Sequence, residues 1–340
     1  MRTSITALAS LLALTPSVGA GGVVQVSPRF AVAELTAPGG GRSGASGMNE
    51  KGQVVGSVDA RAVLWTDGHP TYLVGRDRQS GATGINDNEQ VLVTIRDDEG
   101  KRGSREETPC EPEAFTGRSF LWEKGRLTDL KIDTATALNN AGQIVGFGIP
   151  GKQHAVLWEK GRITDLGTRG VESGFASFAS GINARGQVVG FSTVDGGQAS
   201  SAFLWEDGRA ITFGGKRTQP QAINDAGHIV GTDGTSSSEY HAFLRRDGRM
   251  LDLGQVGRGR GSMAAAVNGR DQVVGMALTV GVAIPHAFLW EDGRLLDLND
   301  EIPAGPGWVL ETATDINNRG QIVGMGRFRD QPRGFRLTPK

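Results

Sequence analysis

The sequence has little cysteine, and neither acidic nor basic residues are in clear excess. Cys110 is the only cysteine in 340 residues, so no internal disulfide can form, and the core must be large enough to fold without one. A lone cysteine could be a reactive thiol, but we interpret Cys110 as an ordinary loop residue. With 36 basic and 37 acidic residues the net charge is −1, and no polybasic run provides an electrostatic footprint for nucleic acid or an anionic membrane. We therefore expect no nucleic-acid partner.

Long apolar runs are also lacking, apart from one at the start. Arg2 is followed by an Ala- and Leu-rich stretch at residues 5–14, and Val18-Gly19-Ala20 supplies small residues for cleavage, which is typical of a secretory signal peptide. The run is too short to span a bilayer, which takes about 20 residues. We expect a signal peptide at 1–20, a short N-terminal segment at 21–30 and one domain at 31–340. The protein should then be secreted, extracellular or periplasmic, with no transmembrane segment.

Catalytic and metal-binding motifs are missing from the sequence. It contains no Gly-x-Ser-x-Gly, no His-Glu-x-x-His and no phosphate-binding loop. The acidic run at 97–99 lacks the spacing of a calcium loop, and we interpret it as solvated. His154, His241 and His286 occupy equivalent places in different copies of a repeat, which would keep them apart, whereas zinc needs converging ligands. We expect neither a metal nor a cofactor.

Glycine, by contrast, is abundant, with 52 residues, about twice the usual share of ~7%. The excess belongs to an internal repeat. Its core is two small residues, a variable residue, an aliphatic residue and Asn, then three turn residues and Gln/His-[Ile/Val]-Val-Gly. The repeated asparagines are Asn49, Asn86, Asn139, Asn183, Asn224, Asn268 and Asn317. An aromatic-rich strand such as Ala-Phe-Leu-Trp follows in each copy, then a charged turn and a further strand, so each unit should hold four short strands.

Two tight turns recur in each unit, as in 223–228 and 290–294. Both fit a type I turn followed by a left-handed glycine, the common three-residue hairpin loop. Asn at the start can cap such a turn through its side-chain oxygen. Glu89 and Asp271 stand where glycine is expected, so these two turns should be strained or differently shaped.

Serial units of 40–50 residues with four short strands predict an all-β fold, a seven-bladed β-propeller of four-stranded antiparallel blades. A solenoid is the alternative, but it would leave exposed edges that need capping repeats. The last unit lacks a final strand, and residues 31–36 supply a spare one at the beginning. We therefore predict that this N-terminal strand completes the last blade and closes the ring.

These motifs resemble the HAF-repeat family of extracellular proteins, named for a His-Ala-Phe triplet. The triplet is intact at 241–243 and 286–288 and appears as His-Ala-Val at 154–156. The resemblance covers about residues 31–337. It implies an extracellular repeat protein and supplies no catalytic signature.

In an up-and-down meander the two tight turns share one face, and the remaining connections share the other. Those connections vary in length, from residues 57–61 in the first unit to about 94–118 in the second. Variable loops on a regular scaffold are typical of binding surfaces, although unconstrained drift would look the same. The aromatic and basic residues that we place in these connections as ligand-binding candidates are Trp308, Tyr240, Phe175, Phe178, Arg258 and Arg260. Loop aromatics can also pack back onto their own blade.

The innermost strands should line a central channel, and the two positions ahead of each aliphatic-Asn pair are small or polar in nearly every unit. Only Asp315 is ionisable there; it is a further ligand-binding candidate, although a lone aspartate is thin support for acid–base catalysis. The preferred hypothesis is a monomeric binding scaffold for a protein or glycan. A hydrolase acting on glycans or lactones is the alternative, and it should show several carboxylates or histidines converging on the variable face. A structural envelope or matrix component is the third hypothesis, and it predicts apolar patches on the blade rims.

Overall fold

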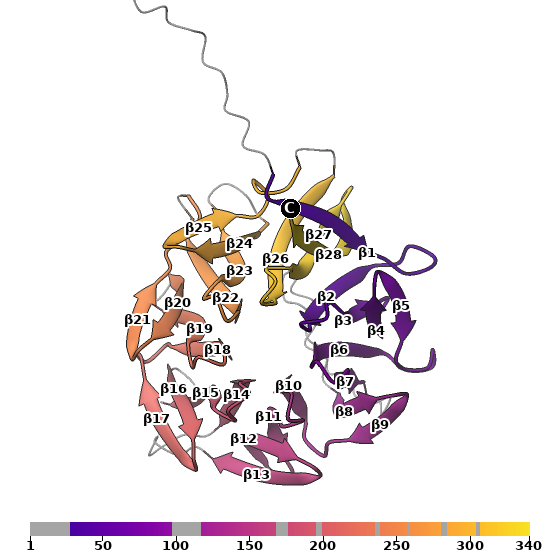
Figure 1. Cartoon of the computed structure of the whole chain (residues 1–340). Coiled ribbons are helices and arrows are strands. Elements are labelled where there is room, and N and C mark those ends of the chain that lie inside the picture. The colour runs from indigo at the N-terminus through magenta and orange to yellow at the C-terminus, as the bar shows by residue number, and fades with distance from the viewer. Residues whose placement is uncertain are drawn as a thin grey trace, which may run out of the picture.

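The repeat folds as predicted into four-stranded antiparallel units around a common axis. The computed structural model describes residues 28–96, 117–167, 176–194, 199–234, 239–257, 259–279, 284–303 and 307–340. Within them the regular elements are strands, and Figure 1 shows these strands arranged as a ring, each unit running from an inner strand near the axis to an outer strand at the rim. The chain is an all-β propeller.

The strands follow one another from the axis outward in each unit. The first unit holds β2 (Ser43–Met48), β3 (Val54–Val58), β4 (Arg61–Thr66) and β5 (His69–Tyr72), and the second β6 (Ser80–Ile85), β7 (Val91–Ile95), β8 (Arg118–Glu123) and β9 (Arg126–Asp129). The third holds β10 (Thr134–Leu138), β11 (Ile144–Ile149), β12 (Lys152–Glu159) and β13 (Arg162–Gly167), and the fourth β14 (Ser177–Ile182), β15 (Val188–Val194), β16 (Ala199–Glu206) and β17 (Arg209–Phe213).

The fifth unit holds β18 (Gln219–Ile223), β19 (Ile229–Gly234), β20 (Tyr240–Arg246) and β21 (Arg249–Asp252), and the sixth β22 (Gly261–Val267), β23 (Val273–Leu278), β24 (His286–Glu291) and β25 (Arg294–Asp297). The closing unit holds β26 (Trp308–Ile316), β27 (Ile322–Phe328), β28 (Gln331–Pro339) and β1 (Phe30–Leu35). Among the described residues these strands form five four-stranded sheets and one eight-stranded sheet. The large sheet consists of the fifth and sixth units, joined at the single parallel pair Tyr240–Gly261.

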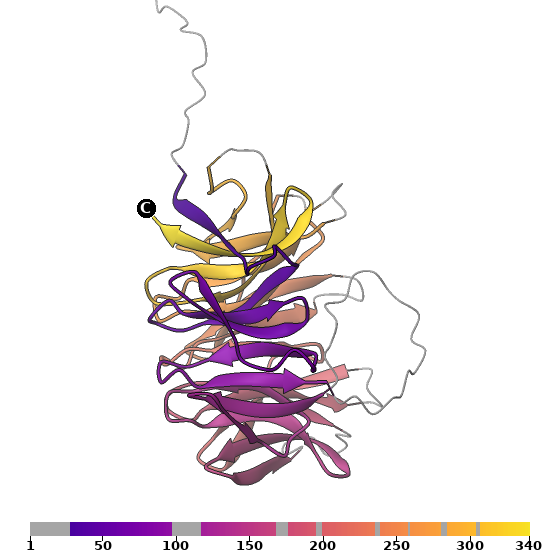
Figure 2. The same ribbon diagram turned by 90° about the vertical axis from the view of Figure 1, so that its right-hand side faces the viewer.

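The ring closes through the N-terminal strand. β1 pairs antiparallel with β28 over its whole length, from Phe30 opposite Pro339 to Leu35 opposite Gly334. Figure 2 shows the indigo β1 beside the yellow C-terminal strand. Arg333 on β28 also donates to Glu34 on β1 at 2.7 Å. The predicted closing strand at 31–36 is thus confirmed, with its bounds one residue earlier.

The first tight turn has the predicted form. In the first unit the Gly52 N–H donates to the Asn49 carbonyl at 3.0 Å, and Gly52 has φ of +82°. The second turn was predicted wrongly. Glu291 pairs directly with Arg294, so Asp292 and Gly293 form a two-residue loop with φ of +49° and +77°. Two successive positive φ values define a type I′ turn, whose twist matches that of the flanking strands.

Glu89 and Asp271 keep the shape of the glycine turns that they replace. Their φ values are +62° and +61°, and each N–H still donates to the carbonyl of its repeated asparagine. The left-handed conformation costs a residue with a Cβ roughly 1–2 kcal/mol. Of the two alternatives that the sequence left open, the turns are therefore strained and not differently shaped.

The core lies between neighbouring sheets. One cluster joins Leu244 of β20 to Phe288 and Trp290 of β24, and another joins Phe30 of β1 to Leu289 of β24 and Phe335 of β28. Phe288 and Phe335 are fully buried. Because each strand alternates its side chains between the two faces of its sheet, every sheet buries apolar residues against both neighbours. The repeated tryptophans contribute to this packing, as the sequence predicted.

Hydrogen bonds between asparagines link all the units near the axis. The side-chain Nδ2 of each repeated asparagine donates to the backbone carbonyl of the next one along the chain, at 2.9–3.3 Å. The last asparagine, Asn317, donates to the first, Asn49. The bonds therefore form a closed ring. Each of these asparagines is also buried and accepts, through its side-chain oxygen, the N–H of the fourth residue after it.

Candidate functional site

The histidines that precede the Ala-Phe strands pair within their own sheets. Nδ1 of His154, His241 and His286 lies 3.0, 2.8 and 2.6 Å from an aspartate eleven residues later, on the outermost strand. Arg118 forms the same kind of pair with Asp129. The position thus joins the third strand of a unit to the fourth. In the described ranges, no three His, Cys, Asp or Glu side chains are placed to hold a metal ion.

Two of the predicted binding aromatics pack inward. Trp308 is the first residue of β26 rather than a loop residue, and its ring lies 5.1 Å from that of Phe328 and 6.2 Å from that of Phe335. Phe178 lies in the inner strand β14, between Phe147 and Phe191 at ring distances of 4.8 and 5.1 Å. We predicted that both residues lie in variable connections, and this was wrong. Both lie in the inner strand of a unit, and their rings pack against aromatic side chains of neighbouring strands.

Two other candidates lie close together on the surface. Tyr240 begins β20 and is 44% exposed, and its backbone pairs with Gly261, the residue after Arg260. Tyr240 too is a strand residue. Phe175 and Arg258 fall outside the described residues, as do Cys110, the acidic run at 97–99 and most of the long connection at 94–118. The described candidates do not converge on one site.

Asp315 spans the junction between the closing unit and the first unit. Its carboxylate accepts the N–H of Met48 on β2 at 2.8 Å and that of its own neighbour Ile316 at 2.8 Å. Burial raises the pKa of Asp315 to about 6, against the two N–H donors, and the nearby Glu50 adds to the rise. The other units carry glycine or alanine here, and Gly47 on the adjoining strand leaves room for the carboxylate.

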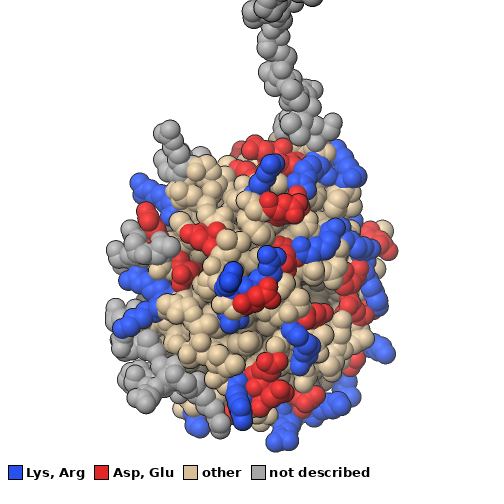
Figure 3. Space-filling model, turned by 60° about the vertical axis from the view of Figure 1, so that its left-hand side comes forward, with Lys and Arg blue, Asp and Glu red and all other residues tan. Residues whose placement is uncertain are grey.

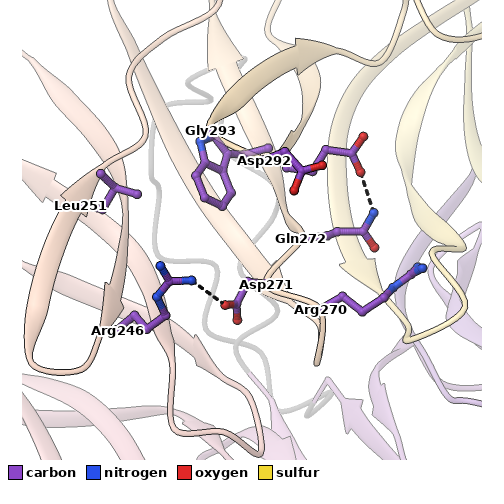
Figure 4. Close-up of a pocket in the computed structure, with 9 residues that line it drawn as sticks. Arg246, Leu251, Arg270, Asp271, Gln272, Asp292 and Gly293 are labelled. Carbon is purple, nitrogen blue, oxygen red and sulfur yellow. Dashed lines mark hydrogen bonds and ion pairs between the residues drawn. The ribbon is translucent and has the colours of Figure 1, made fainter.

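A polar hollow lies on the face of the tight turns. It has a volume of about 580 Å³ and opens between the fifth and sixth units. Asp271 and Gln272 enter it from the turn after β22, and Asp292 and Gly293 from the turn after β24. Figure 4 shows Arg246 directed at Asp271 across the hollow.

Asp271 is the centre of a hydrogen-bonded cluster at the floor of this hollow. It accepts from His228 Nδ1 at 2.6 Å, from Asn224 Nδ2 at 3.3 Å and from Arg246 Nη1 at 3.2 Å. In every other unit a glutamine stands at the place of His228 and bonds the repeated asparagine. The histidine in the fifth unit and the aspartate in the sixth therefore compensate each other.

A second hollow of about 420 Å³ adjoins the first, between the sixth unit and the closing unit. Glu291 lies in the wall that the two hollows share. It accepts from Gln272 Nε2 at 2.7 Å and from Arg29 Nη2. Burial opposes ionisation of Glu291, but these hydrogen bonds and the charges of Arg29 and Arg270 hold its pKa below the ordinary value. Glu291 is therefore a fixed anion.

Charges of both signs cover this side of the molecule. Figure 3 shows Lys and Arg interspersed with Asp and Glu, without a broad area of one sign in that view.

The sequence analysis did not identify this region. The available signal was the paired departure of His228 and Asp271 from the repeat, which marks the boundary between the fifth and sixth units. We expected Trp290 only to pack, yet it is 8% exposed and also lines the first hollow.

Comparisons with solved structures agree on the fold. The β-propeller domain of the Trilobed protease from Pyrococcus furiosus superposes with a TM-score of 0.52 at 15% identity, over 87% of this chain and 93% of that one. The extracellular domain of a candidate one-component system from B. thetaiotaomicron gives a TM-score of 0.51 at 7% identity, over 91% of this chain and 40% of that one. A gluconolactonase from Xanthomonas campestris gives 0.45 at 12% identity, over 93% and 95%.

These identities are too low to indicate more than a shared propeller fold. No protein-family model matches the chain, and no curated protein matches it. The resemblance to HAF repeats thus stays a prediction. The described part of the chain contains no helix with the length and hydrophobicity needed to cross a bilayer.

Proposed function

We propose that this protein is an exported propeller that binds a protein or glycan ligand and does not catalyse a reaction. The observation that carries the proposal is the state of the carboxylates in the hollow at the fifth and sixth units. Asp271 accepts three hydrogen bonds and Glu291 two. Hydrogen bonds that fix the orientation of a carboxylate suit it to recognition of a ligand.

A hydrolase is the main alternative, because three acidic residues, Asp271, Glu291 and Asp292, line one hollow. A general acid at neutral pH needs a carboxyl group whose pKa is raised toward 7. The pKa of Glu291 is lowered, and Asp271 already accepts three hydrogen bonds from neighbouring side chains. This pair therefore suits ligand binding better than proton transfer.

A structural envelope or matrix component should carry apolar patches on the rim of the propeller. Leu127, Ile211 and Leu251 are 37%, 57% and 49% exposed on the outer strands β9, β17 and β21. They lie on three different units, and single exposed apolar residues are ordinary in soluble proteins. This distribution favours a binding protein over a component that assembles through its rim.

Export is the part of the proposal that depends on the sequence alone. It rests on the signal-like pattern of residues 1–20 and on the resemblance to HAF repeats. Expression of the full chain with a reporter fused after Lys340, followed by fractionation and N-terminal sequencing, tests it. We expect a product outside the cytoplasm that begins at Gly21, and retention with Met1 intact would contradict export.

A glycan array and a pull-down from secreted proteins, both with residues 21–340, test the binding function. We expect enrichment of a defined ligand in one of them. A panel of esters, lactones and glycosides provides the opposing test. Hydrolysis that is lost in Asp292→Asn, without enrichment of any ligand, would replace the binding proposal with the hydrolase.

A further inference from the structure

The second hollow, at the ring closure, is lined by more cationic than anionic side chains. Four cationic side chains line it: Arg29, Arg270, Arg319 and Lys340. They come from the residue before β1, from two tight turns and from the end of β28, so the group exists only when the ring is closed. Arg29 forms an ion pair with Glu291 and a second one with Glu301, with 3.7 Å between Arg29 Nε and Glu301 Oε2. Within the described ranges no carboxylate forms an ion pair with Arg270, Arg319 or Lys340.

The repeat explains why two of these arginines lack counter-ions. Arg270 and Arg319 occupy the third position of their turns, and Lys51 occupies the same position in the first unit. Lys51 reaches the next turn and pairs with Glu89 at 3.2 Å. Arg270 and Arg319 reach the next turn in the same way but meet glycine, so the guanidinium of Arg270 lies at this hollow and that of Arg319 at the junction with the first unit. A Cβ on Gly320 would lie 2.6 Å from Arg270 Nη2, and one on Gly52 would lie 2.8 Å from Arg319 Nη2.

The geometry points to an oxyanion site at this hollow. We infer that Arg270 and Lys340, which both line this hollow, bind the acidic group of an acidic oligosaccharide, a carboxylate or a sulfate. Guanidinium groups bind such oxyanions through paired N–H donors. Figure 4 shows Arg270 extending away from the Arg246–Asp271 pair, so it is free for this second hollow.

A sugar ligand is favoured by the shape and chemistry of the adjoining surface. The first hollow continues from the second through the shared residues Arg270, Gln272 and Glu291. It offers the carboxylate of Asp292, the amide of Gln272 and part of the side chain of Trp290. Side chains of these kinds bind sugar hydroxyls and the apolar faces of sugar rings. The acidic sugar would lie at the ring closure and its neighbours over the first hollow.

This inference deepens the proposed binding function and rests on it. The chain also supplies a matched control. Arg185 occupies the same turn position, and its Nη2 lies 2.6 Å from a Cβ built on Gly227, but Arg185 does not line this hollow. Replacement of Arg185 therefore removes an equivalent cation from a different junction.

Calorimetric titration of residues 21–340 with a galacturonic acid hexamer, its methyl ester and a sulfated oligosaccharide of similar length tests the inference. We expect the uronate or the sulfated probe to bind, the neutral ester to bind at least about tenfold more weakly, and Arg270→Gln with Lys340→Gln to weaken binding at least about tenfold. Arg185→Gln should leave the affinity unchanged, and the thermal melting of all variants should match the parent.

Two outcomes would overturn the inference in different ways. Equal binding by the parent and by the Arg270→Gln, Lys340→Gln variant would remove the site from this hollow while leaving a glycan-binding protein. Absence of binding by all three probes would reject the acidic sugar, and enrichment of an acidic protein in the pull-down would then retain the binding function with another ligand.

Discussion

The side-chain amide of Asn317 donates to the backbone carbonyl of Asn49 at 3.3 Å, across 268 residues of sequence. This bond completes the ring of asparagine bonds and joins the closing unit to the first. The closing strand β1 joins the same two units from the rim, since Leu35 of β1 packs with Val54 of β3 and Val323 of β27. The ring is thus fastened both at the axis and at its edge.

The asparagine ring should be sensitive to loss of a single donor. Asn183→Asp keeps the size of the side chain but replaces its Nδ2 donor, which bonds Gln187 at 2.7 Å and Asn224 at 3.0 Å, with an acceptor. Unpaired buried polar groups typically cost about 1–3 kcal/mol each. We expect the free energy of unfolding in urea to fall by at least about 2 kcal/mol. Glu159→Gln, an exposed change of similar size, should alter it by less than about 0.5 kcal/mol. Equal effects of the two changes would show that the ring contributes little.

The two non-glycine turns should respond in opposite ways to restoration of glycine. Glu89→Gly relieves a left-handed residue, worth roughly 1–2 kcal/mol, and loses only an exposed ion pair with Lys51 worth at most about 1 kcal/mol. Stability should stay the same or rise. Asp271→Gly removes the acceptor of three donors and should lower stability by about 1–3 kcal/mol.

The double variant His228→Gln, Asp271→Gly provides the control for this pair. It restores the repeat pattern, so that the glutamine introduced in the fifth unit can bond Asn224 as the other glutamines bond their own asparagines. Thermal denaturation should show recovery of most of the loss from Asp271→Gly. A double variant no more stable than the single one would contradict the compensation between the fifth and sixth units.

Asp315 should make stability depend on pH between about 4 and 6. Its pKa in the folded protein, about 6, is raised from 3.8, so the folded state binds its proton more tightly than the unfolded state. The contribution to stability is therefore full below about pH 4 and is lost as the pH rises through 6. At about 1.4 kcal/mol per pKa unit, the loss is on the order of 3 kcal/mol. The difference in unfolding free energy between the parent and Asp315→Asn should follow this curve, and a difference that is constant from pH 4 to 7 would contradict it.

The closing strand should contribute strongly to stability through its buried end. Leu35 is 2% exposed between the closing and first units, and Leu35→Ala should cost about 2–5 kcal/mol. Leu127 is 37% exposed on β9, and Leu127→Ala serves as the control, with an effect within about 0.5 kcal/mol. Chemical denaturation measures both. Equal effects would mean that β1 is not part of the folded ring.

The sequence predicted the features that depend on local chemistry repeated in every unit. The Asn-to-glycine turn, the four short strands and the spare strand at 31–36 were readable because each is a fixed pattern of residue types. The type I′ turn at Asp292–Gly293 was missed, although Asp-Gly between strands is its usual signal, because the turn was assigned by analogy with the asparagine turn. The bulged residue in every inner strand, such as Ala265 between the paired Ala264 and Ala266, was also unpredictable, since small residues there indicate crowding but not register.

The candidate site depends on contacts between units and could not be read in the same way. Arg270 and Asp271 are adjacent in sequence, yet Asp271 bonds residues of the fifth unit whereas Arg270 reaches Gly320 of the closing unit. Trp308 and Phe178 looked like loop aromatics because strand ends extend beyond the repeat in β26 and β14. The contacts of these four side chains depend on how neighbouring sheets are arranged, which the sequence pattern does not show.

Ring closure by the N-terminal strand is tested most directly by a cross-link between β1 and β28. Ala33 and Arg336 face each other in the register and are not buried, and directly opposite residues have Cβ atoms about 4.5–5.5 Å apart. In a Cys110→Ser background, Ala33→Cys with Arg336→Cys should form an intramolecular disulfide on mild oxidation, seen as one faster-migrating species in a non-reducing gel. Ala33→Cys with Arg162→Cys, on the remote strand β13, should not. Failure of the first pair to cross-link, or cross-linking of both pairs alike, would contradict the closed ring and the hollow that it forms.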